Sequence, residues 1–245
     1  NYLNANMNLV EKGVLTPIRI SGWMRAVVSD VEEGFKNIPK LKHVNLSIST
    51  SEQMIVGKFQ GRMGFEEVIR TMTESVKAAK SLGAETIGVN AEDASRTKIE
   101  NLIEFAIAAK EAGADRIRYC DTLGYDTPFT IYEKVYKLAE GAKIPVELHC
   151  HNDLGMAVAC SVAGAKAAVD AGVDAYINTT VNGMGERTGN ADLVSCILAV
   201  KYGAGMEKYK LDENINLKMA WKIAHYASYA FKVPIPINQV GVGKN

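Results

Sequence analysis

The stretch Ala109-Lys110-Glu111-Ala112-Gly113-Ala114-Asp115-Arg116-Ile117 has the pattern of a helix that ends at a glycine and is followed directly by a strand. Glycine just beyond a helix end adopts the left-handed cap conformation at low cost. The pattern recurs at residues 79–87, 138–146 and 168–176. Its glycines are 30, 28 and 31 residues apart, namely Gly83, Gly113, Gly141 and Gly172. A period of about 30 residues is the size of a βα unit, so helices and strands are predicted to alternate.

Two earlier segments extend this series, Ile18-Arg19-Ile20-Ser21 and Val44-Asn45-Leu46-Ser47-Ile48. Residues 51–64 separate the second strand from the third unit and are expected to form an extended loop over one rim. Alternation with helices implies a parallel sheet. Six strands are therefore expected, starting near Ile18, Val44, Thr86, Arg116, Val146 and Ala175.

Six βα units are fewer than the eight of a closed TIM barrel. The alternative is an open, doubly wound sheet, but its glycine-rich turn after the first strand is missing. Polar residues follow four successive strands, and such convergence on one mouth is typical of TIM barrels. We therefore predict a TIM (β/α)8-type α/β barrel that lacks its first two βα units. The polar segments are Glu92-Asp93, Asp121-Thr122, His149 with His151, and Asn182 to Asn190.

The composition of the 245 residues, 47% hydrophobic and 23% charged, suits a globular domain. Lys+Arg and Asp+Glu balance at 28 each, and no basic stripe indicates nucleic-acid or membrane binding. No apolar run approaches the roughly 20 residues of a membrane helix. The four cysteines form no CxxC pair and are expected to be reduced core residues of a cytoplasmic protein. The chain starts at Asn1 rather than Met, so its natural N-terminus is expected upstream.

The segment Val146-Glu147-Leu148 has the composition of a buried strand, and His149-Cys150-His151 follows it. Side chains two residues apart on a strand leave the same face. His149 and His151 could therefore contact one metal ion, while Cys150 would point the other way. The alternative is that neighbouring backbone groups satisfy both rings. Neutral imidazole is the commonest metal ligand, so we predict a metal site, with Asn152-Asp153 as orienting groups.

The other polar segments each have a structural alternative. The glycine-rich loop that ends at Asn190 could bind phosphate, but Asn190 as the N-cap of a helix over 191–200 is favoured. Glu92-Asp93 could supply a general base or cap a helix over 97–112. Asp121-Thr122 could bind a carboxylate or open a turn. His43 is expected to be structural, and His225 to pack or lie at an interface. Arg96 and Arg187 could each hold an anion, but a solvated charge is favoured for either residue alone.

A helix is expected over residues 216–231. Trp221, His225 and Tyr229 would line one side of it, and Met219, Ile223, Tyr226 and Ala230 another. A helix that is apolar over most of its circumference is either buried or shared with a partner.

Two motifs together resemble the DRE-TIM metallolyases. They are His149-Cys150-His151-Asn152-Asp153-Leu154-Gly155 and Asn182-Gly183-Met184-Gly185-Glu186-Arg187-Thr188-Gly189-Asn190. Within that family they resemble the acyl-CoA Claisen-condensing enzymes, the 2-isopropylmalate, citramalate and homocitrate synthases. The resemblance runs from about Ile18 to the end of the chain. Four further segments are most similar to the homocitrate synthases of nitrogen fixation: residues 23–26, 90–96, 121–124 and 178–183.

The resemblance implies a metal-dependent condensation of acetyl-CoA with a 2-oxo acid. The favoured acceptor is 2-oxoglutarate, which would give homocitrate, and 2-isopropylmalate or citramalate synthesis is the alternative. His149 and His151 would ligate a divalent metal (Mg, Mn or Zn), with Asn190 as a further or nearby ligand. The remaining implied roles are acid–base chemistry for Glu92, substrate binding for Thr122 and Asn90, and orientation of the site for Asp153 and Glu186.

The Asp-Arg-Glu-like run that opens the family's first strand is not found, in agreement with the count of βα units. We expect that the chain is a segment of a longer enzyme, or that another polypeptide supplies the N-terminal strands. Residues 1–205 would be the partial barrel. Residues 206–245 would hold the C-terminal helix and the start of a linker to a subdomain that contributes to a homodimer.

Three other functions stay open. A non-catalytic subunit or scaffold would keep only half of the site. A metal-dependent hydrolase barrel would need its His-x-His on the first strand and further histidine ligands, and the chain offers only His43 and His225. A retro-aldol lyase of the same superfamily is less favoured because of the His-Asn-Asp sequence that follows the strand.

Overall fold

The computed structural model describes residues 2–15 and 18–244. Helices and six strands alternate along them. The chain divides into two compact units. Unit 1 comprises Asn1–Tyr119 and Gly141–Pro145, and unit 2 comprises Cys120–Glu140 and Val146–Asn245.

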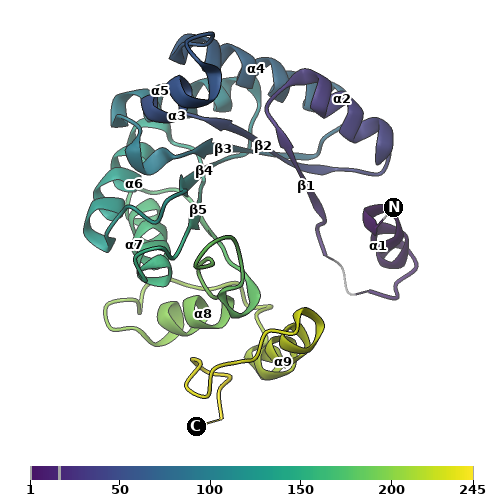
Figure 1. The fold of residues 1–245 in the computed structure, drawn as a ribbon, viewed down its shortest axis with the longest axis vertical. Coiled ribbons are helices and arrows are strands. Elements are labelled where there is room, and N and C mark those ends of the chain that lie inside the picture. The colour runs from purple at the N-terminus through teal and green to yellow at the C-terminus, as the bar shows by residue number, and fades with distance from the viewer. Residues whose placement is uncertain (1, 16–17, 245) are drawn as a thin grey trace. The chain divides into compact units, whose positions relative to one another are not determined.

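Unit 1 contains four parallel strands and the helices between them (Figure 1). The strands are β1 (Ser21–Arg25), β2 (His43–Ser49), β3 (Thr86–Glu92) and the first residues of β4 (Arg116–Asp121). The helices are α1 (Tyr2–Glu11), α2 (Val28–Asn37), α3 (Glu52–Phe59), α4 (Phe65–Ser81), the short η1 (Ala94–Arg96) and α5 (Ile99–Ala112).

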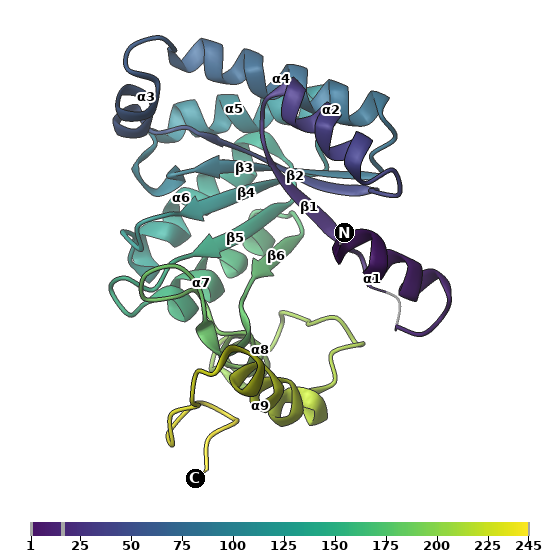
Figure 2. The same ribbon diagram turned by 45° about the vertical axis from the view of Figure 1, so that its right-hand side comes forward.

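Helices α2, α4 and α5 lie on one side of strands β1 to β3 (Figure 2). Strand residues Leu46 and Val89 are fully buried, and so are Val76 of α4 and Phe105 of α5. Burial of these apolar side chains stabilises the layer by roughly 1.5–3 kcal/mol for each large residue. This packing fixes the carboxyl end of β3, where Glu92 lies.

Unit 2 contains the end of β4, the parallel pair β5 (Val146–Cys150) and β6 (Ala175–Asn178), and further helices. The helices are α6 (Pro128–Ala142, whose last two residues belong to unit 1), α7 (Ala157–Asp170), the short η2 (Val181–Gly183), α8 (Leu193–Tyr202), the short η3 (Leu217–Met219) and α9 (Ala220–Phe231). Helix α7 contacts both strands. It approaches β5 closely because Gly164 lacks a side chain, and a Cβ there would lie 2.5 Å from Leu148 Cδ1.

The predicted α/β class with six parallel strands and flanking helices is confirmed, but three local predictions are wrong. The first strand begins at Ser21 rather than Ile18, because Ser21 is the first residue with a partner in the register, His43. Residues 51–64 contain α3, and the Ser51 hydroxyl accepts a hydrogen bond from Met54 N at 3.2 Å. Gly141 lies inside α6, and Lys143 takes the left-handed conformation with φ 49°.

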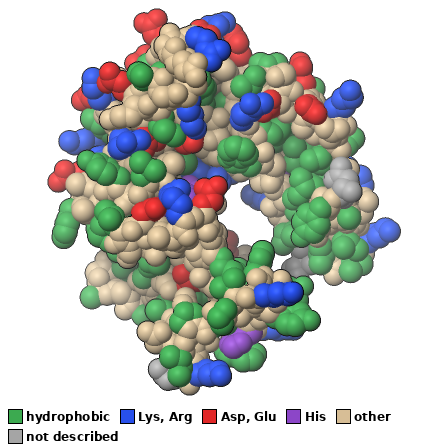
Figure 3. Space-filling model, in the orientation of Figure 1, with side chains coloured by type: hydrophobic (Ala, Val, Ile, Leu, Met, Phe, Trp, Pro, Cys, Tyr) green, Lys and Arg blue, Asp and Glu red, His purple; other side chains and the backbone are tan. Residues whose placement is uncertain are grey.

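The C-terminal helix α9 is not buried, contrary to one of the two predicted alternatives. Only its small residues Ala224 and Ala227 are buried. Trp221, Tyr226 and Tyr229 are 59%, 70% and 83% exposed, and Figure 3 shows apolar side chains on the surface around this helix. A partner on this face stays a prediction, as does the division of the chain at residue 205.

The four cysteines are buried and free, as predicted. Burial raises the pKa of the Cys160 and Cys196 thiols to about 12. Both thiols therefore stay protonated at neutral pH. Among the described helices, none has the length and apolar character that crossing a membrane requires.

Candidate active site

His149 lies at the end of β5 and is held by a chain of hydrogen bonds from β6. Its Nδ1 lies 2.8 Å from Oδ1 of Asn178, its register partner on β6. The Asn178 amide in turn donates from Nδ2 to Glu147 Oε1 at 3.3 Å. Because a carboxylate only accepts, it orients the amide so that Oδ1 faces the ring. In this arrangement His149 carries its proton on Nδ1, and Nε2 is the ring nitrogen with the lone pair.

His151 lies beside His149, and their ring centroids are 5.0 Å apart in an edge-to-face arrangement. The side chain is buried, yet no described residue forms a hydrogen bond with its Nδ1. An unsatisfied buried nitrogen costs about 1–3 kcal/mol. Burial, followed by the nearby Arg187 guanidinium, lowers the pKa of His151. A neutral ring with an unpaired nitrogen is the form that binds a metal.

Asn190 lies directly against His151, because the two residues form an antiparallel β-bridge. Its backbone N–H donates to Gly183 O at 3.0 Å, which folds the loop 183–190 back on itself. The predicted role of Asn190 as a helix N-cap is wrong. Helix α8 starts at Leu193, and its N-cap is Asp192, whose carboxylate accepts from Ser195 N at 2.9 Å.

The donors near His151 fit a divalent metal in part. Imidazole nitrogen suits Zn, and an amide oxygen suits Mg or Mn. In the described part of the chain, no group of three or more His, Cys, Asp and Glu residues could hold a metal ion. A metal centre at His149 and His151 therefore stays a prediction, and among the described residues no carboxylate joins the two histidines.

Asp153 and Thr122 lie on the loops that follow β5 and β4, and both contact Arg187. The Arg187 guanidinium forms a two-point ion pair with Asp153 at 2.8 and 2.9 Å and donates to Thr122 O at 2.5 Å. This pairing lowers the pKa of Asp153. The expectation that Arg187 is merely solvated is wrong. Asn152, predicted to orient the metal ligands, instead accepts from Ala157 N at the start of α7, and the Glu186 side chain is exposed.

Glu92 and Asn90 lie at the end of β3 in unit 1. The Ser49 hydroxyl donates to Glu92 Oε2 at 2.6 Å, and Lys58 Nζ lies 2.7 Å from both carboxylate oxygens. Asn90 is buried, and its Oδ1 has no hydrogen-bond partner among the described residues. An amide oxygen in that state is available to a bound ligand.

The capping alternative for Glu92-Asp93 is wrong, because α5 begins at Ile99 without a side-chain cap. Asp93 instead pairs with Arg96 at 2.6 Å, so Arg96 is not simply solvated. The other two histidines contact neighbouring side chains, although Nε2 of His225 is buried without a hydrogen-bond partner among the described residues. His43 Nδ1 lies 2.8 Å from Thr86 Oγ1, and the His225 ring stacks on Trp221 with centroids 3.9 Å apart.

Four residues that hold predicted site residues in place were missed: Ser49 and Lys58 in unit 1, and Glu147 and Asn178 in unit 2. Their partners lie 29 to 43 residues away along the chain, so short-range spacing does not reveal these contacts. The alignment of β5 with β6 is the one signal that could have identified Asn178.

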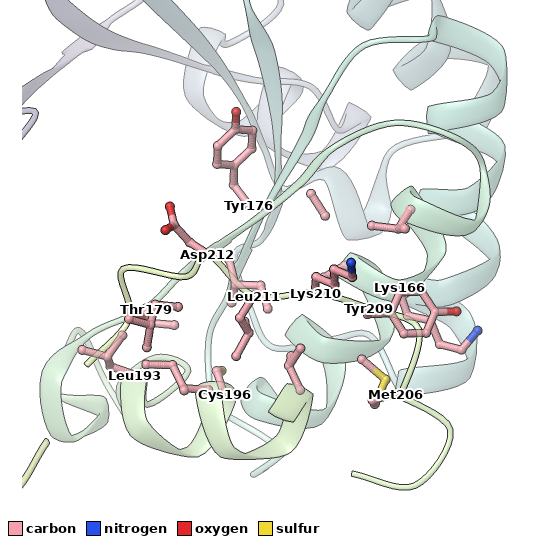
Figure 4. Close-up of a pocket in the computed structure, with 17 residues that line it drawn as sticks. Lys166, Tyr176, Thr179, Leu193, Cys196, Met206, Tyr209, Lys210, Leu211 and Asp212 are labelled. Carbon is pink, nitrogen blue, oxygen red and sulfur yellow. The ribbon is translucent and has the colours of Figure 1, made fainter. Parts of the chain in front are cut away.

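Unit 2 also contains a cavity of about 380 Å³ between α7, β6, α8 and residues 206–215 (Figure 4). Its wall is mostly apolar, and none of the predicted site residues lines it. Tyr209, labelled in Figure 4, donates to Asp170 Oδ1 at 2.6 Å, and Lys208 Nζ lies 3.0 Å from the same atom. Through these contacts Asp170, the last residue of α7, fixes the position of residues 206–215, which form one wall of the cavity.

We expect Asn178→Leu to weaken divalent-metal binding about 10–100-fold, the usual cost of losing a group that orients a ligand. The reason is that His149 then loses the acceptor that keeps its proton on Nδ1. Glu147→Gln should have a smaller effect in the same direction. Calorimetric titration with Mn²⁺ measures both, with the exposed Asn238→Leu as the control. Equal affinity of Asn178→Leu and the unaltered protein would contradict the role of Asn178.

A parallel α/β fold with polar side chains at the carboxyl ends of its strands is the architecture of βα-barrel proteins. Comparison with known proteins supplies the family. The HMGL-like family profile matches residues 8–226, and the chain belongs to this family. The family resemblance derived from the two motifs is thereby confirmed.

The chain is similar to several curated synthases. It is 61% identical over 245 residues to citrate (Re)-synthase of Dehalococcoides mccartyi, covering 100% of the chain and 59% of the relative. It is 43% identical over 226 residues to 2-isopropylmalate synthase 2 of Caldanaerobacter subterraneus, covering 92% and 55%. It is 34% identical over 223 residues to homocitrate synthase 1 of Nostoc sp., covering 91% and 55%. The chain thus spans 55–59% of the length of these relatives.

Among solved structures, an HMG-CoA lyase from Bacillus subtilis matches with a TM-score of 0.70 and 16% identity. The match covers 90% of this chain and 73% of the lyase. At that identity the likeness concerns the fold alone.

Proposed function

We propose that the whole protein condenses acetyl-CoA with a 2-oxo acid, and that the acceptor is oxaloacetate, which gives citrate. The observation that carries this proposal is the 61% identity with citrate (Re)-synthase along the entire chain. Identity with the homocitrate synthase of Nostoc is 34%. The predicted acceptor 2-oxoglutarate is not confirmed and becomes the alternative. The two acids differ by one methylene, which a pocket distinguishes by only about 10–200-fold.

His149 and His151 would hold a divalent cation, with the Asn190 amide beside them. When bound, such a cation polarises a carbonyl as a Lewis acid. The chain prepares both rings for this role in different ways. Asn178 keeps the proton of His149 on Nδ1, and burial disfavours protonation of His151.

The other site residues would bind and activate the substrates. The Thr122 hydroxyl would donate to the carboxylate of the acceptor, and the free amide oxygen of Asn90 would accept from a substrate. Glu92 would take a proton from the acetyl methyl group, with Ser49 and Lys58 holding its carboxylate in place. Positioned acid–base groups of this kind contribute typically 10²–10⁴-fold to the rate.

Three further expectations belong to this proposal. The protein would act in the cytoplasm, in agreement with its free, buried cysteines. It would work as a homodimer or together with a polypeptide that supplies the remaining strands. A link to nitrogen fixation follows only if the acceptor is 2-oxoglutarate.

The test is an acceptor panel on the whole protein. Oxaloacetate, 2-oxoglutarate, pyruvate and 3-methyl-2-oxobutanoate are each supplied with acetyl-CoA and Mg²⁺ or Mn²⁺, and released CoA thiol is measured. We expect kcat/KM for oxaloacetate to exceed that for every other acceptor by at least about tenfold. A higher kcat/KM for 2-oxoglutarate than for oxaloacetate would assign homocitrate as the product. Absence of CoA release with all four acids would favour the non-catalytic scaffold.

A further inference from the structure

One arginine joins three loops of unit 2. Arg187 lies on the loop after β6, and its guanidinium holds Asp153 on the loop after β5 through two hydrogen bonds of 2.8 and 2.9 Å. The same Nη2 donates to the backbone oxygen of Thr122, which follows β4, at 2.5 Å. The planar fork of arginine allows these contacts together, and a lysine ammonium cannot reproduce the two-point pair.

The backbones of these loops are also in direct contact. His151 N donates to Asp121 O at 3.2 Å, and Asn152 N donates to Gly189 O at 2.9 Å. Gly124 has φ 58°, and a Cβ there would lie 2.9 Å from both Asp153 N and His151 O. A shift of the Thr122 turn would therefore change its distance from His151.

The backbone conformation of Arg187 indicates that its contact with Asp153 and Thr122 has a function. Its φ of 55° lies in the left-handed region, which is unfavourable for a residue with a side chain. Such residues persist where the surroundings determine them, and they cluster at functional sites. In this backbone conformation the guanidinium makes three hydrogen bonds to the other two loops.

We propose that Arg187 is a positioning residue that sets the distance between Thr122 and His151, and so determines how well the site binds the 2-oxo acid. This inference rests on the proposed function, in which Thr122 receives the acceptor carboxylate. In this role Arg187 acts through its contacts with Asp153 and the Thr122 peptide oxygen. Its loss should therefore affect binding of the acceptor more than binding of acetyl-CoA or of the metal.

The test compares Arg187→Lys, Arg187→Gln, Asp153→Asn and the Arg187→Gln/Asp153→Asn double variant in the whole protein. We expect Arg187→Lys to raise KM for the 2-oxo acid at least tenfold. KM for acetyl-CoA and Mn²⁺ affinity should change less than twofold. The double variant should have the same KM for the 2-oxo acid as Arg187→Gln, because either change alone already breaks the Arg187–Asp153 ion pair. The control is Arg70→Lys on α4, an arginine that also pairs with carboxylates, Glu67 and Glu74, on an exposed surface.

A second measurement is independent of turnover. Amide hydrogen exchange of the substrate-free protein should become faster at residues 122–125 and 152–155 in Arg187→Lys and Asp153→Asn, and stay unchanged in α4 and α5. This result supports the positioning role even if no acceptor is turned over, in which case only the proposed function fails. Unchanged exchange together with unchanged KM would overturn the inference. Faster exchange throughout unit 2 with a lowered melting temperature would also overturn it, since Arg187 would then be merely structural.

Discussion

Replacing His151 by alanine is expected to lower kcat/KM of the whole protein about 1,000-fold and to remove its bound divalent metal. A Lewis-acid metal contributes several kcal/mol of charge stabilisation to the transition state, and about 4 kcal/mol corresponds to three factors of ten. His151 should be the more sensitive of the two histidines. It is buried with an unpaired Nδ1 and lies against Asn190, whereas His149 keeps a hydrogen bond to Asn178. His149→Ala should follow the same direction.

Elemental analysis of the purified variants gives metal content, and CoA release gives turnover. His43→Gln is the control, because His43 starts β2 and its ring contacts Thr86. The metal content and turnover of His43→Gln should stay within about twofold of those of the original protein. A His151→Ala protein that retains its metal and turnover within tenfold of the original would rule out this pair as the metal site.

Gly189→Ala is expected to lower the free energy of unfolding by more than about 2 kcal/mol and to abolish turnover. Gly189 has φ 89°, and an added Cβ would lie 2.0 Å from the backbone oxygen of Gly183. The left-handed region costs an alanine roughly 1–2 kcal/mol, and relief of the contact requires the loop backbone to move as well. That movement would break the hydrogen bond from Asn190 N to Gly183 O and so displace Asn190 from His151.

Gly172→Ala is the matched control. Gly172 has a similar φ of 85°, but no atom lies within 4 Å of the position its Cβ would take. Gly172→Ala should lower the free energy of unfolding by only roughly 1–2 kcal/mol, the cost of an alanine in the left-handed conformation. Its turnover should be unchanged. Denaturant titration of both variants measures the difference. Equal losses would mean that the 183–190 loop accommodates a Cβ, against the close contact seen here.

The positions of the later strands were predictable because they depend on local patterns. A repeat of about 30 residues with a glycine after each helix is sufficient to place the later strands, and β3 to β6 lie where the pattern predicts. The strand-end pair His149 and His151 follows from the two-residue period of a strand. The first strand was misplaced because Ile18 has the right composition but no register partner on β2.

The hydrogen bonds that make the site specific were not predictable, because they join loops and strands distant in the chain. Nothing near Asn178 marks it as the partner of His149 until β5 and β6 are aligned. Arg187 has the local sequence of a solvated loop arginine, and its pairing with Asp153 spans 34 residues. The same holds for Lys58 and Glu92 in unit 1, also 34 residues apart.

By itself, the sequence determined the alternation of helices and strands, the parallel α/β class, the family motifs and the histidine pair, because periodicity and short spacings encode them. The packed structure set which ring nitrogen of His149 faces Asn178, that Asp192 rather than Asn190 caps α8, and that Arg187 joins the loops carrying Thr122 and Asp153. The physical reason is that hydrogen bonds of this kind depend on orientation and distance within a few tenths of an ångström. Only the packing of strands and loops against one another sets those quantities.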